Sequence, residues 1–143
     1  MILVDVNVLV YAQRTDVPDH REYREWLETI LNGDEVFGVS ELVLSGVIRI
    51  LTHPKIFKRP TPLKRAQEYV GLIRNAELAA PVHAGTRHWD IFQSLLGEAG
   101  ARGNLVPDAY LAALAIESGC EWITTDRDFS RFRRLRWRHP LRA

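Results

Sequence analysis

The chain has 143 residues, of which 46% are hydrophobic, and its formal net charge is +1. This length and composition predict one globular domain over residues 1–143 with enough apolar side chains for a single core. The only cysteine, Cys120, excludes an internal disulfide and a thiolate metal cluster. That cysteine usage is typical of a reducing compartment, so we expect a cytoplasmic protein.

The amino terminus has no basic start and is interrupted by Asp5 and Asn7, so we do not expect a signal peptide. No apolar run approaches the length that a membrane span needs.

Charge is distributed unevenly along the chain. Residues 1–125 carry 12 Lys/Arg and 16 Asp/Glu, whereas residues 126–143 carry 7 Arg and 2 Asp. This asymmetry predicts an anionic partner near the carboxyl end, or else an exposed arginine-rich edge without a ligand.

The first expected element is a buried strand. Residues 2–4 form an apolar, β-branched run of the kind that parallel sheets bury on both faces. Asp5 interrupts the run, so we expect the strand to end there. The chain should then turn through Asn7 into a short helical segment that ends around residues 11–12.

The next segment predicts helix, strand and helix. The spacing of apolar side chains in residues 19–31 favours an amphipathic helix, and residues 36–39 favour a second buried strand. Ser40 is a preferred N-cap residue and should begin a helix that ends at His53. Glu41 opens that helix on an apolar stripe, so its side chain is predicted to lie along an apolar face.

The middle of the chain is rich in prolines. Residues 55–60 predict a basic loop, after which Thr61 is expected as an N-cap and Pro62 as the first helical residue. Residues 79–82 form at best an edge strand, because proline cannot donate to a ladder. Residues 86–99 predict a further helix.

Residues 104–119 predict a buried central helix, because alanine and leucine dominate and Gly119 suits a left-handed cap. Asp108 lies on an apolar stripe of this helix, which would point a carboxylate inward. The alternative is that Asp108 satisfies free backbone N–H groups and the helix dipole at the amino-terminal end.

The last elements are expected to be strands. Residues 120–125 favour a strand that ends at Asp126, and the alternation in residues 135–138 favours an edge strand. Strands that alternate with helices predict the α/β class, with a parallel sheet covered on both faces and right-handed crossovers.

Acidic side chains follow several of the predicted strands. Asp5 follows the first strand and Glu41 the second, Asp126 and Asp128 follow the strand that begins at Cys120, and Asp108 starts the helix before it. Ligands bind parallel sheets outside the carboxyl ends of the strands. Carboxylates that converge at roughly 5 Å would repel by about 3 kcal/mol per pair at an effective dielectric near 20. Bound protons or a cation would relieve this cost.

An all-oxygen cluster suits hard Mg²⁺ or Mn²⁺, and such ions serve phosphoryl chemistry by activating water and stabilising charge. Hydrolysis of a phosphodiester is therefore the predicted reaction. The histidines show no metal-ligand spacing, and we expect each in a loop or on the surface: His20, His53, His83, His88 and His139.

Polar neighbours could orient the carboxylates or a water molecule by hydrogen bonds. These are Asn7, Thr124 and Thr125, although ordinary strand-end and turn chemistry is the preferred interpretation for Thr124. The sequence contains no G-x-S-x-G, no P-loop and no G-x-G-x-x-G, which argues against acyl transfer and against nucleotide binding through those motifs.

Over its whole length the chain resembles the PIN-domain family, specifically the VapC toxins of bacterial type II toxin–antitoxin pairs. The resemblance is carried by the order and spacing of five stretches: LVDVNVLVYA (residues 3–12), SEL (40–42), GVIRILT (46–52), GNLVPDAYLAA (103–113) and TTDRDF (124–129).

The resemblance implies a compact α/β/α sandwich with a short, mainly parallel sheet of four to five strands, and a Mg²⁺- or Mn²⁺-dependent endoribonuclease site. By position in the motifs, the acidic quartet would be Asp5, Glu41, Asp108 and Asp126, with Asp128 as an accessory acid. Asn7 and Asn104 match polar positions beside that site.

The resemblance also implies a homodimer and a small VapB-like antitoxin that blocks the acidic pocket, with the apolar faces of the first helices as its groove. Arginines near the carboxyl end would hold the RNA backbone, and the candidates are Arg127, Arg131, Arg133 and Arg134.

Two other functions remain open on the sequence. A phosphohydrolase with an aspartyl nucleophile at Asp5 would need a second acid at the position that Asn7 occupies. A non-catalytic module that binds RNA or protein would use the acids only as helix caps.

Overall fold

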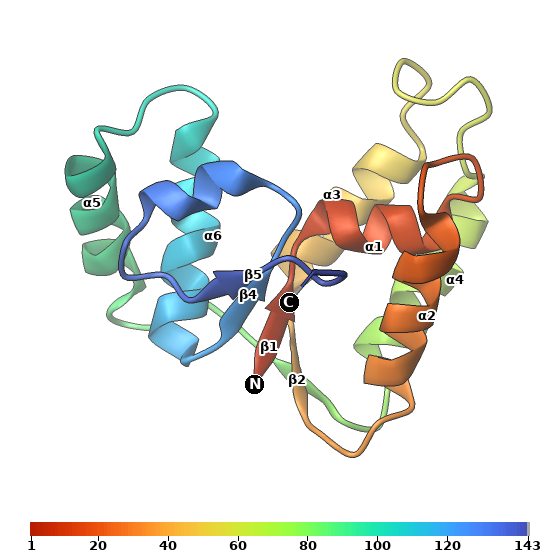
Figure 1. The fold of residues 1–143 in the computed structure, drawn as a ribbon, viewed down its shortest axis with the longest axis horizontal. Coiled ribbons are helices and arrows are strands. Elements are labelled where there is room, and N and C mark those ends of the chain that lie inside the picture. The colour runs from red at the N-terminus through yellow and green to blue at the C-terminus, as the bar shows by residue number, and fades with distance from the viewer. Residues whose placement is uncertain (143) are drawn as a thin grey trace.

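The computed structural model describes residues 1–142. In chain order (Figure 1) the elements are β1 (Ile2–Val4), α1 (Val6–Gln13), α2 (His20–Leu31), β2 (Phe37–Val39), α3 (Glu41–Leu51), α4 (Leu63–Arg74), β3 (Ala79–Pro81), α5 (His88–Ala99), α6 (Leu105–Ser118), β4 (Glu121–Ile123), the 3₁₀ helix η1 (Arg127–Arg131) and β5 (Trp137–Arg138). The predicted α/β class is confirmed.

The five strands form one parallel sheet in the order β3-β2-β1-β4-β5. β1 lies at the centre, where Leu3 pairs with Gly38 of β2 on one side and with Trp122 of β4 on the other. β3 and β5 are the edge strands, as the sequence predicted.

The direction of the chain across the sheet reverses after β3. Helices α1 to α4 therefore cover one face and α5 and α6 the other, as right-handed crossovers require (Figure 1). This arrangement is an α/β/α sandwich. Among residues 1–142, no helix is long and apolar enough to cross a membrane.

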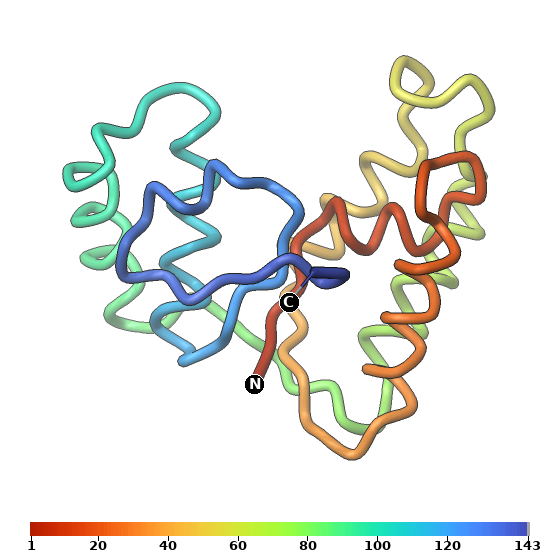
Figure 2. The backbone as a smooth tube through the Cα atoms, in the orientation of Figure 1, coloured from red at the N-terminus to blue at the C-terminus, as the bar shows by residue number. Residues whose placement is uncertain are grey.

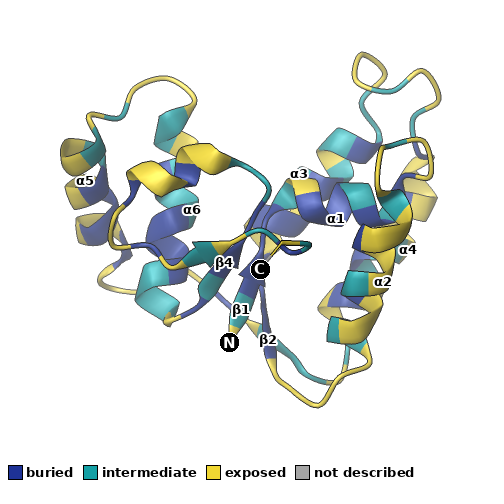
Figure 3. Ribbon diagram, viewed as in Figure 1, coloured by how far each residue is buried: buried dark blue, intermediate teal, exposed yellow. Residues whose placement is uncertain are grey.

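The core is densest around β1, β4 and the central helix α6. Trp122 and Ile123 of β4 are fully buried, and so are Ala109, Ala112 and Ala113 on the inward side of α6. Figure 3 shows buried residues in the sheet and on the inner faces of the helices, and exposed residues on η1. The small alanine side chains let α6 pack closely on the sheet and give the helix a fixed position.

The carboxyl-terminal residues return across the fold toward the amino-terminal helices (Figure 2). The ring of His139 lies 6.3 Å from the ring of Tyr23 in α2, and the ring of Tyr23 lies 5.2 Å from that of Tyr11 in α1. The segment after β5 thus packs against helices on the α1 side of the sheet.

Two expectations from the sequence are wrong. Pro62, not Thr61, occupies the N-cap position of α4, because Thr61 is buried and its hydroxyl hydrogen-bonds with Gln13 and Arg14. His88 is neither in a loop nor on the surface. It is the first residue of α5, 2% exposed, and its Nε2 lies 3.0 Å from the carbonyl oxygen of Tyr110.

The glycine cap of α6 allows a stability prediction. Gly119 has a φ of 71°, in the left-handed region, where a side chain costs roughly 1–2 kcal/mol. We expect Gly119→Ala to lower the free energy of unfolding in urea by about that amount. Gly97, inside α5, is the matched control, because an added methyl group would meet no other atom within 4 Å there. Gly97→Ala should raise stability by about 0.4–1 kcal/mol, and equal effects of the two substitutions would contradict the assignment.

Candidate active site

Asp5 stands where β1 passes directly into α1. Its N–H donates to the carbonyl of Ile123 at 2.9 Å, which extends the pairing of β1 with β4 by one residue. Its Oδ1 accepts from the N–H of Val6 at 2.7 Å, so Asp5 is also the N-cap of α1. The residue is only 7% exposed. The strand end therefore fixes a buried carboxylate at the carboxyl edge of the sheet.

Thr124 connects Asp5 to Asp126. The Thr124 hydroxyl donates to Oδ2 of Asp5 at 2.6 Å, and Oγ1 of Thr124 accepts from the N–H of Asp126 at 3.0 Å. Thr124 is fully buried. Thr124 therefore makes the ordinary turn bond to the N–H two residues on, and in addition its hydroxyl holds the carboxylate of Asp5, which is 119 positions away in the sequence.

Asp126 follows β4 and caps η1, where its Oδ1 accepts from the N–H of Asp128 at 2.9 Å. Within residues 1–142, the Oδ2 atom of Asp126 has no hydrogen-bond partner and remains able to bind a ligand. Asp128 is exposed on η1. These positions agree with a central role for Asp126 and a peripheral one for Asp128.

Asp108 lies in the first turn of α6 and is partly buried. Burial raises the pKa of Asp108 to about 6, and the negative charges of Asp126, Asp5 and Asp128 act in the same direction. Within residues 1–142, its carboxylate accepts no hydrogen bond, and the N-cap position belongs to Asn104. The geometry therefore does not support the view that Asp108 serves as a helix cap.

The pKa of Asp5 is also raised, mainly because the carboxyl group is buried. Hydrogen bonds from Thr124 and Val6 oppose this shift, while the charge of Asp126 adds to it. Asp5, Asp108 and Asp126, which we call the acidic trio, thus repel one another in a partly desolvated setting. Such a group favours bound protons or a cation.

Glu41 stands apart from the acidic trio. It follows the N-cap Ser40 at the start of α3, but its side chain is 60% exposed and its Oε2 lies 2.8 Å from Nε of Arg74. The expected position along an apolar face is therefore wrong, because the carboxylate turns outward to an arginine of α4.

Asn7 and Asn104, which the resemblance places beside the site, are exposed. Asn7 is in the first turn of α1, and Asn104 occupies the N-cap position of α6 without a side-chain capping bond. Within residues 1–142, neither side chain makes a hydrogen bond.

The predicted RNA-binding arginines lie on and just after η1, the short helix that begins directly after Asp126. Arg127, Arg131, Arg133 and Arg134 are all exposed. Nη1 of Arg134 lies 3.4 Å from the hydroxyl of Ser94 and 3.9 Å from the carboxylate of Glu98, both on α5. The charge asymmetry of the sequence thus corresponds to an exposed positive edge next to the acids.

The sequence did not reveal an apolar groove of about 440 Å³ that adjoins the acidic trio. Two of the lining residues are direct neighbours of the acids in the sequence: Val6 follows Asp5, and Pro107 precedes Asp108. Its full lining is Val6, Leu42, Val43, Phe92, Val106, Pro107, Tyr110 and Leu111. Sequence patterns could not separate these side chains from the core, because both follow the same helical spacing.

Within residues 1–142, no three His, Cys, Asp or Glu side chains are close enough together to form a metal cage. Mg²⁺ usually binds through one or two carboxylates, waters and substrate phosphates, so it needs no such cage. The acidic trio supplies only oxygen donors, and burial together with the charges of Asp126, Asp5 and Asp128 raises the pKa of Asp108. The residues present therefore fit a hard divalent cation.

Comparison with known proteins agrees with this geometry. The family model described as "PIN domain" matches residues 2–135. The chain is 46% identical over 141 residues to Ribonuclease VapC43 of Mycobacterium tuberculosis, an alignment that covers 99% of this chain and 96% of that protein. It is 39% identical to Ribonuclease VapC25 of the same organism, with 98% and 99% covered.

Two solved structures share the fold. The chain superimposes on VapBC2 from Rickettsia felis, bound to a promoter DNA fragment, with a TM-score of 0.66 and 19% identity, covering 97% of this chain and 98% of that one. For FitAB bound to the IR36 DNA fragment, the TM-score is 0.65 at 18% identity, with 100% and 97% covered. The family-model match and the full-length relatives show that this chain belongs to the PIN-domain family.

Proposed function

We propose that the protein is a cytoplasmic endoribonuclease toxin of the VapC type that hydrolyses RNA phosphodiester bonds with Mg²⁺ or Mn²⁺. The observation that carries the proposal is the acidic trio, in which three carboxylates come from separate strand and helix ends and the pKa of Asp108 is raised. The full-length similarity to proteins named ribonucleases supports the same activity.

In this proposal the acidic trio holds the metal, with Asp128 as an accessory acid. A bound divalent ion lowers the pKa of a water ligand and neutralises charge on a phosphate. Thr124 holds Asp5 and the backbone of Asp126 in fixed positions through its bridging hydroxyl. Asn7 and Asn104 would orient water or substrate, and the RNA backbone would be bound by Arg127, Arg131, Arg133 and Arg134.

A small VapB-like antitoxin is the proposed protein partner, since the resemblance implies one and a structural neighbour is named VapBC2. The exposed side chain of Leu72 supports a docking position on α4, since it is 72% exposed. A homodimer is proposed across the apolar groove, whose rim carries the exposed side chains of Leu42 and Trp89. Either contact would remove apolar surface from water.

Removal of single carboxylates should abolish cleavage. We expect Asp5→Asn and Asp108→Asn to lower Mg²⁺- or Mn²⁺-dependent RNA cleavage by at least about 100-fold, since even outer partners of metal ligands are worth 10–100-fold. Asp34→Asn, at an exposed turn after α2, is the matched control and should cleave normally. Circular dichroism would verify folding. Undiminished cleavage by both site variants would refute the assignment.

Metal binding should be visible in stability. The folded-state pKa of Asp108, about 6, lies above its ordinary value of 3.8. The stability it contributes is therefore full below about pH 4 and is lost as pH rises through about 6. Without metal, Asp108→Asn should melt higher than the wild type at about pH 8, with the difference vanishing near pH 4.

Mg²⁺ or Mn²⁺ should then stabilise the wild type more at about pH 8 than at about pH 5, because the carboxylates must be ionised to bind metal. Asp108→Asn should lose most of this metal effect in thermal unfolding, and Asp34→Asn should keep it. A metal-induced shift that is equal in all three proteins would argue against a metal site at the acidic trio.

Glu41 has its own test, because it is held in an ion pair with Arg74. If Glu41 enters the site when substrate and metal bind, Glu41→Gln should lower cleavage while Arg74→Gln, which frees the carboxylate, should leave it equal or higher. If the ion pair is only structural, both variants should cleave alike with small, similar losses of stability, about 0–1 kcal/mol for an exposed pair. The comparison of initial cleavage rates separates the two roles.

A further inference from the structure

A second basic region lies on the other side of the acidic trio from η1. Residues 42–67 contain no acidic residue and carry six cations, Arg49, Lys55, Lys58, Arg59, Lys64 and Arg65. Within residues 1–142, none of the six is in an ion pair. Residues 1–125 have a net charge of −4, but residues 42–67 within them form a positive segment whose charges are not paired.

The loop between α3 and α4, residues 52–62, carries three of these cations and borders a polar cavity of about 430 Å³. Three arginines, Arg14, Arg59 and Arg65, line this cavity together with Gln13, Thr15 and Thr61. The acid among its lining residues, Asp16, is in an ion pair with Arg14. Arginine guanidinium groups and hydroxyls are donors that suit phosphate oxygens. The cavity therefore has the chemistry of an anion-binding site.

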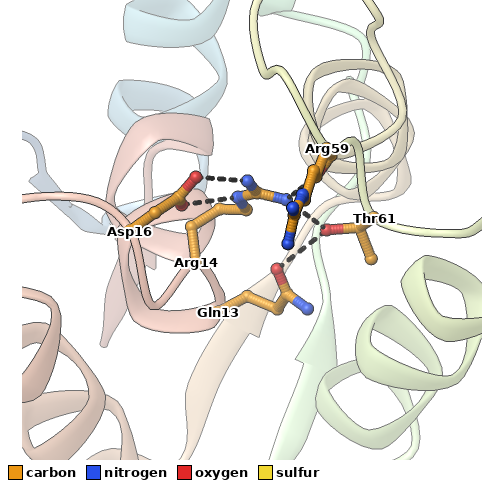
Figure 4. Close-up of polar contacts among 5 residues, drawn as sticks. All are labelled: Gln13, Arg14, Asp16, Arg59 and Thr61. Carbon is orange, nitrogen blue, oxygen red and sulfur yellow. Dashed lines mark hydrogen bonds and ion pairs between the residues drawn. The ribbon is translucent and has the colours of Figure 1, made fainter.

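A buried arginine fixes this loop to the end of α1 (Figure 4). Arg14 is 8% exposed, and its Nη1 donates to the carbonyl of Arg59 at 2.7 Å and to the hydroxyl of Thr61 at 3.3 Å. Its Nε donates to Asp16 at 2.9 Å, and its guanidinium lies 4.0 Å from the ring centroid of Phe57. Because the loop is already ordered, it loses little conformational entropy when it binds a ligand.

The loop and the acidic trio lie at the same edge of the sheet. α1 begins directly after Asp5 and ends at Gln13, beside Arg14. The eight residues of α1 span about 12 Å, which is the length of a few nucleotides of an extended RNA strand. Figure 1 shows η1 and the 52–62 loop beyond the carboxyl ends of the strands, on opposite sides of the start of α1. A strand that crosses the acidic trio can therefore contact both.

We propose that the 52–62 loop, with Arg65 of α4, is a phosphate-binding surface that holds the RNA backbone on the α1 side of the cleavage site. This proposal rests on the proposed ribonuclease function and specifies its substrate as an RNA that extends several nucleotides beyond the scissile bond.

An RNA backbone fits the surface better than an acidic protein segment does. The cations are spread over a loop and a helix rather than gathered at one point, and an RNA strand repeats one negative charge at every nucleotide.

The test compares two double variants that each remove two positive charges. Lys58→Gln with Arg59→Gln alters the loop, and the backbone carbonyl of Arg59 that Arg14 binds is retained. Arg87→Gln with Arg136→Gln is the control, because these side chains reach the carbonyls of Glu117 and Gly119 at the carboxyl end of α6, the opposite edge of the sheet. Thermal unfolding would verify that both variants fold.

Binding is measured by fluorescence anisotropy with single-stranded RNAs of about 4 and about 16 nucleotides, the range of known single-strand site sizes. The metal is left out, so that the readout does not depend on cleavage. The loop variant should bind the longer RNA at least tenfold more weakly. Its slope of log K against log salt concentration should fall by roughly 1.4, for two lost phosphate contacts. The control variant and the short RNA should show little change.

Equal affinity of the loop variant, the control variant and the wild type for the longer RNA would overturn the inference. So would a loop variant that keeps its RNA affinity and loses inhibition by the antitoxin, because the surface would then be a protein-docking site. If the wild type binds RNA through the loop and never cleaves it, the proposed catalytic function fails and the binding surface stands. The two proposals are therefore tested separately.

Discussion

The whole site depends on one buried carboxylate, which is in no ion pair within residues 1–142. Asp5 is held by the hydroxyl of Thr124 and the N–H of Val6 rather than by a lysine or arginine. Neutral donors reduce the cost of burying the ion without cancelling its charge. The remaining negative charge of Asp5 repels the carboxylates of Asp108 and Asp126, so the acidic trio still favours a bound cation.

The rigidity of the surrounding elements makes this repulsion useful. Carboxylates on flexible loops would move apart and lose most of their mutual effect. Asp5 lies between a central strand and a helix with no intervening residue, and Asp108 is carried by α6, whose alanines are fully buried against the sheet. Neither carboxylate can move away from the other acids unless the packed strand or helix that carries it also moves. Active sites often carry such local instability, which the core elsewhere offsets.

Local pattern predicted most of the fold and the positions of the acids. The β-branched run before Asp5 and the alanine-rich run after Asp108 each specify one element with little influence from the rest of the chain, and the carboxyl ends of parallel strands meet at one edge. The predictions failed where a partner distant in sequence decides the outcome. The hydroxyl of Thr61 accepts a hydrogen bond from Arg14, which is 47 positions away, and the carboxylate of Glu41 accepts one from Arg74, 33 positions away. Nothing in the flanking residues of Thr61 or Glu41 indicates these partners.

Negative and positive charges occupy different parts of the site: the acidic trio lies at the centre, and η1 and the 52–62 loop are positive flanks. In the proposed ribonuclease, η1 and the 52–62 loop would attract phosphates on either side of the acidic trio, and the trio would repel the phosphate between them. The two flanks would then supply the affinity for a polyanion, and a bound cation would reduce the repulsion at the centre. In this proposal a chain with a net charge of +1 binds RNA through local positive surfaces. The arginine-rich carboxyl end is then a poor guide to specificity, because phosphate contacts position an RNA and do not read its bases.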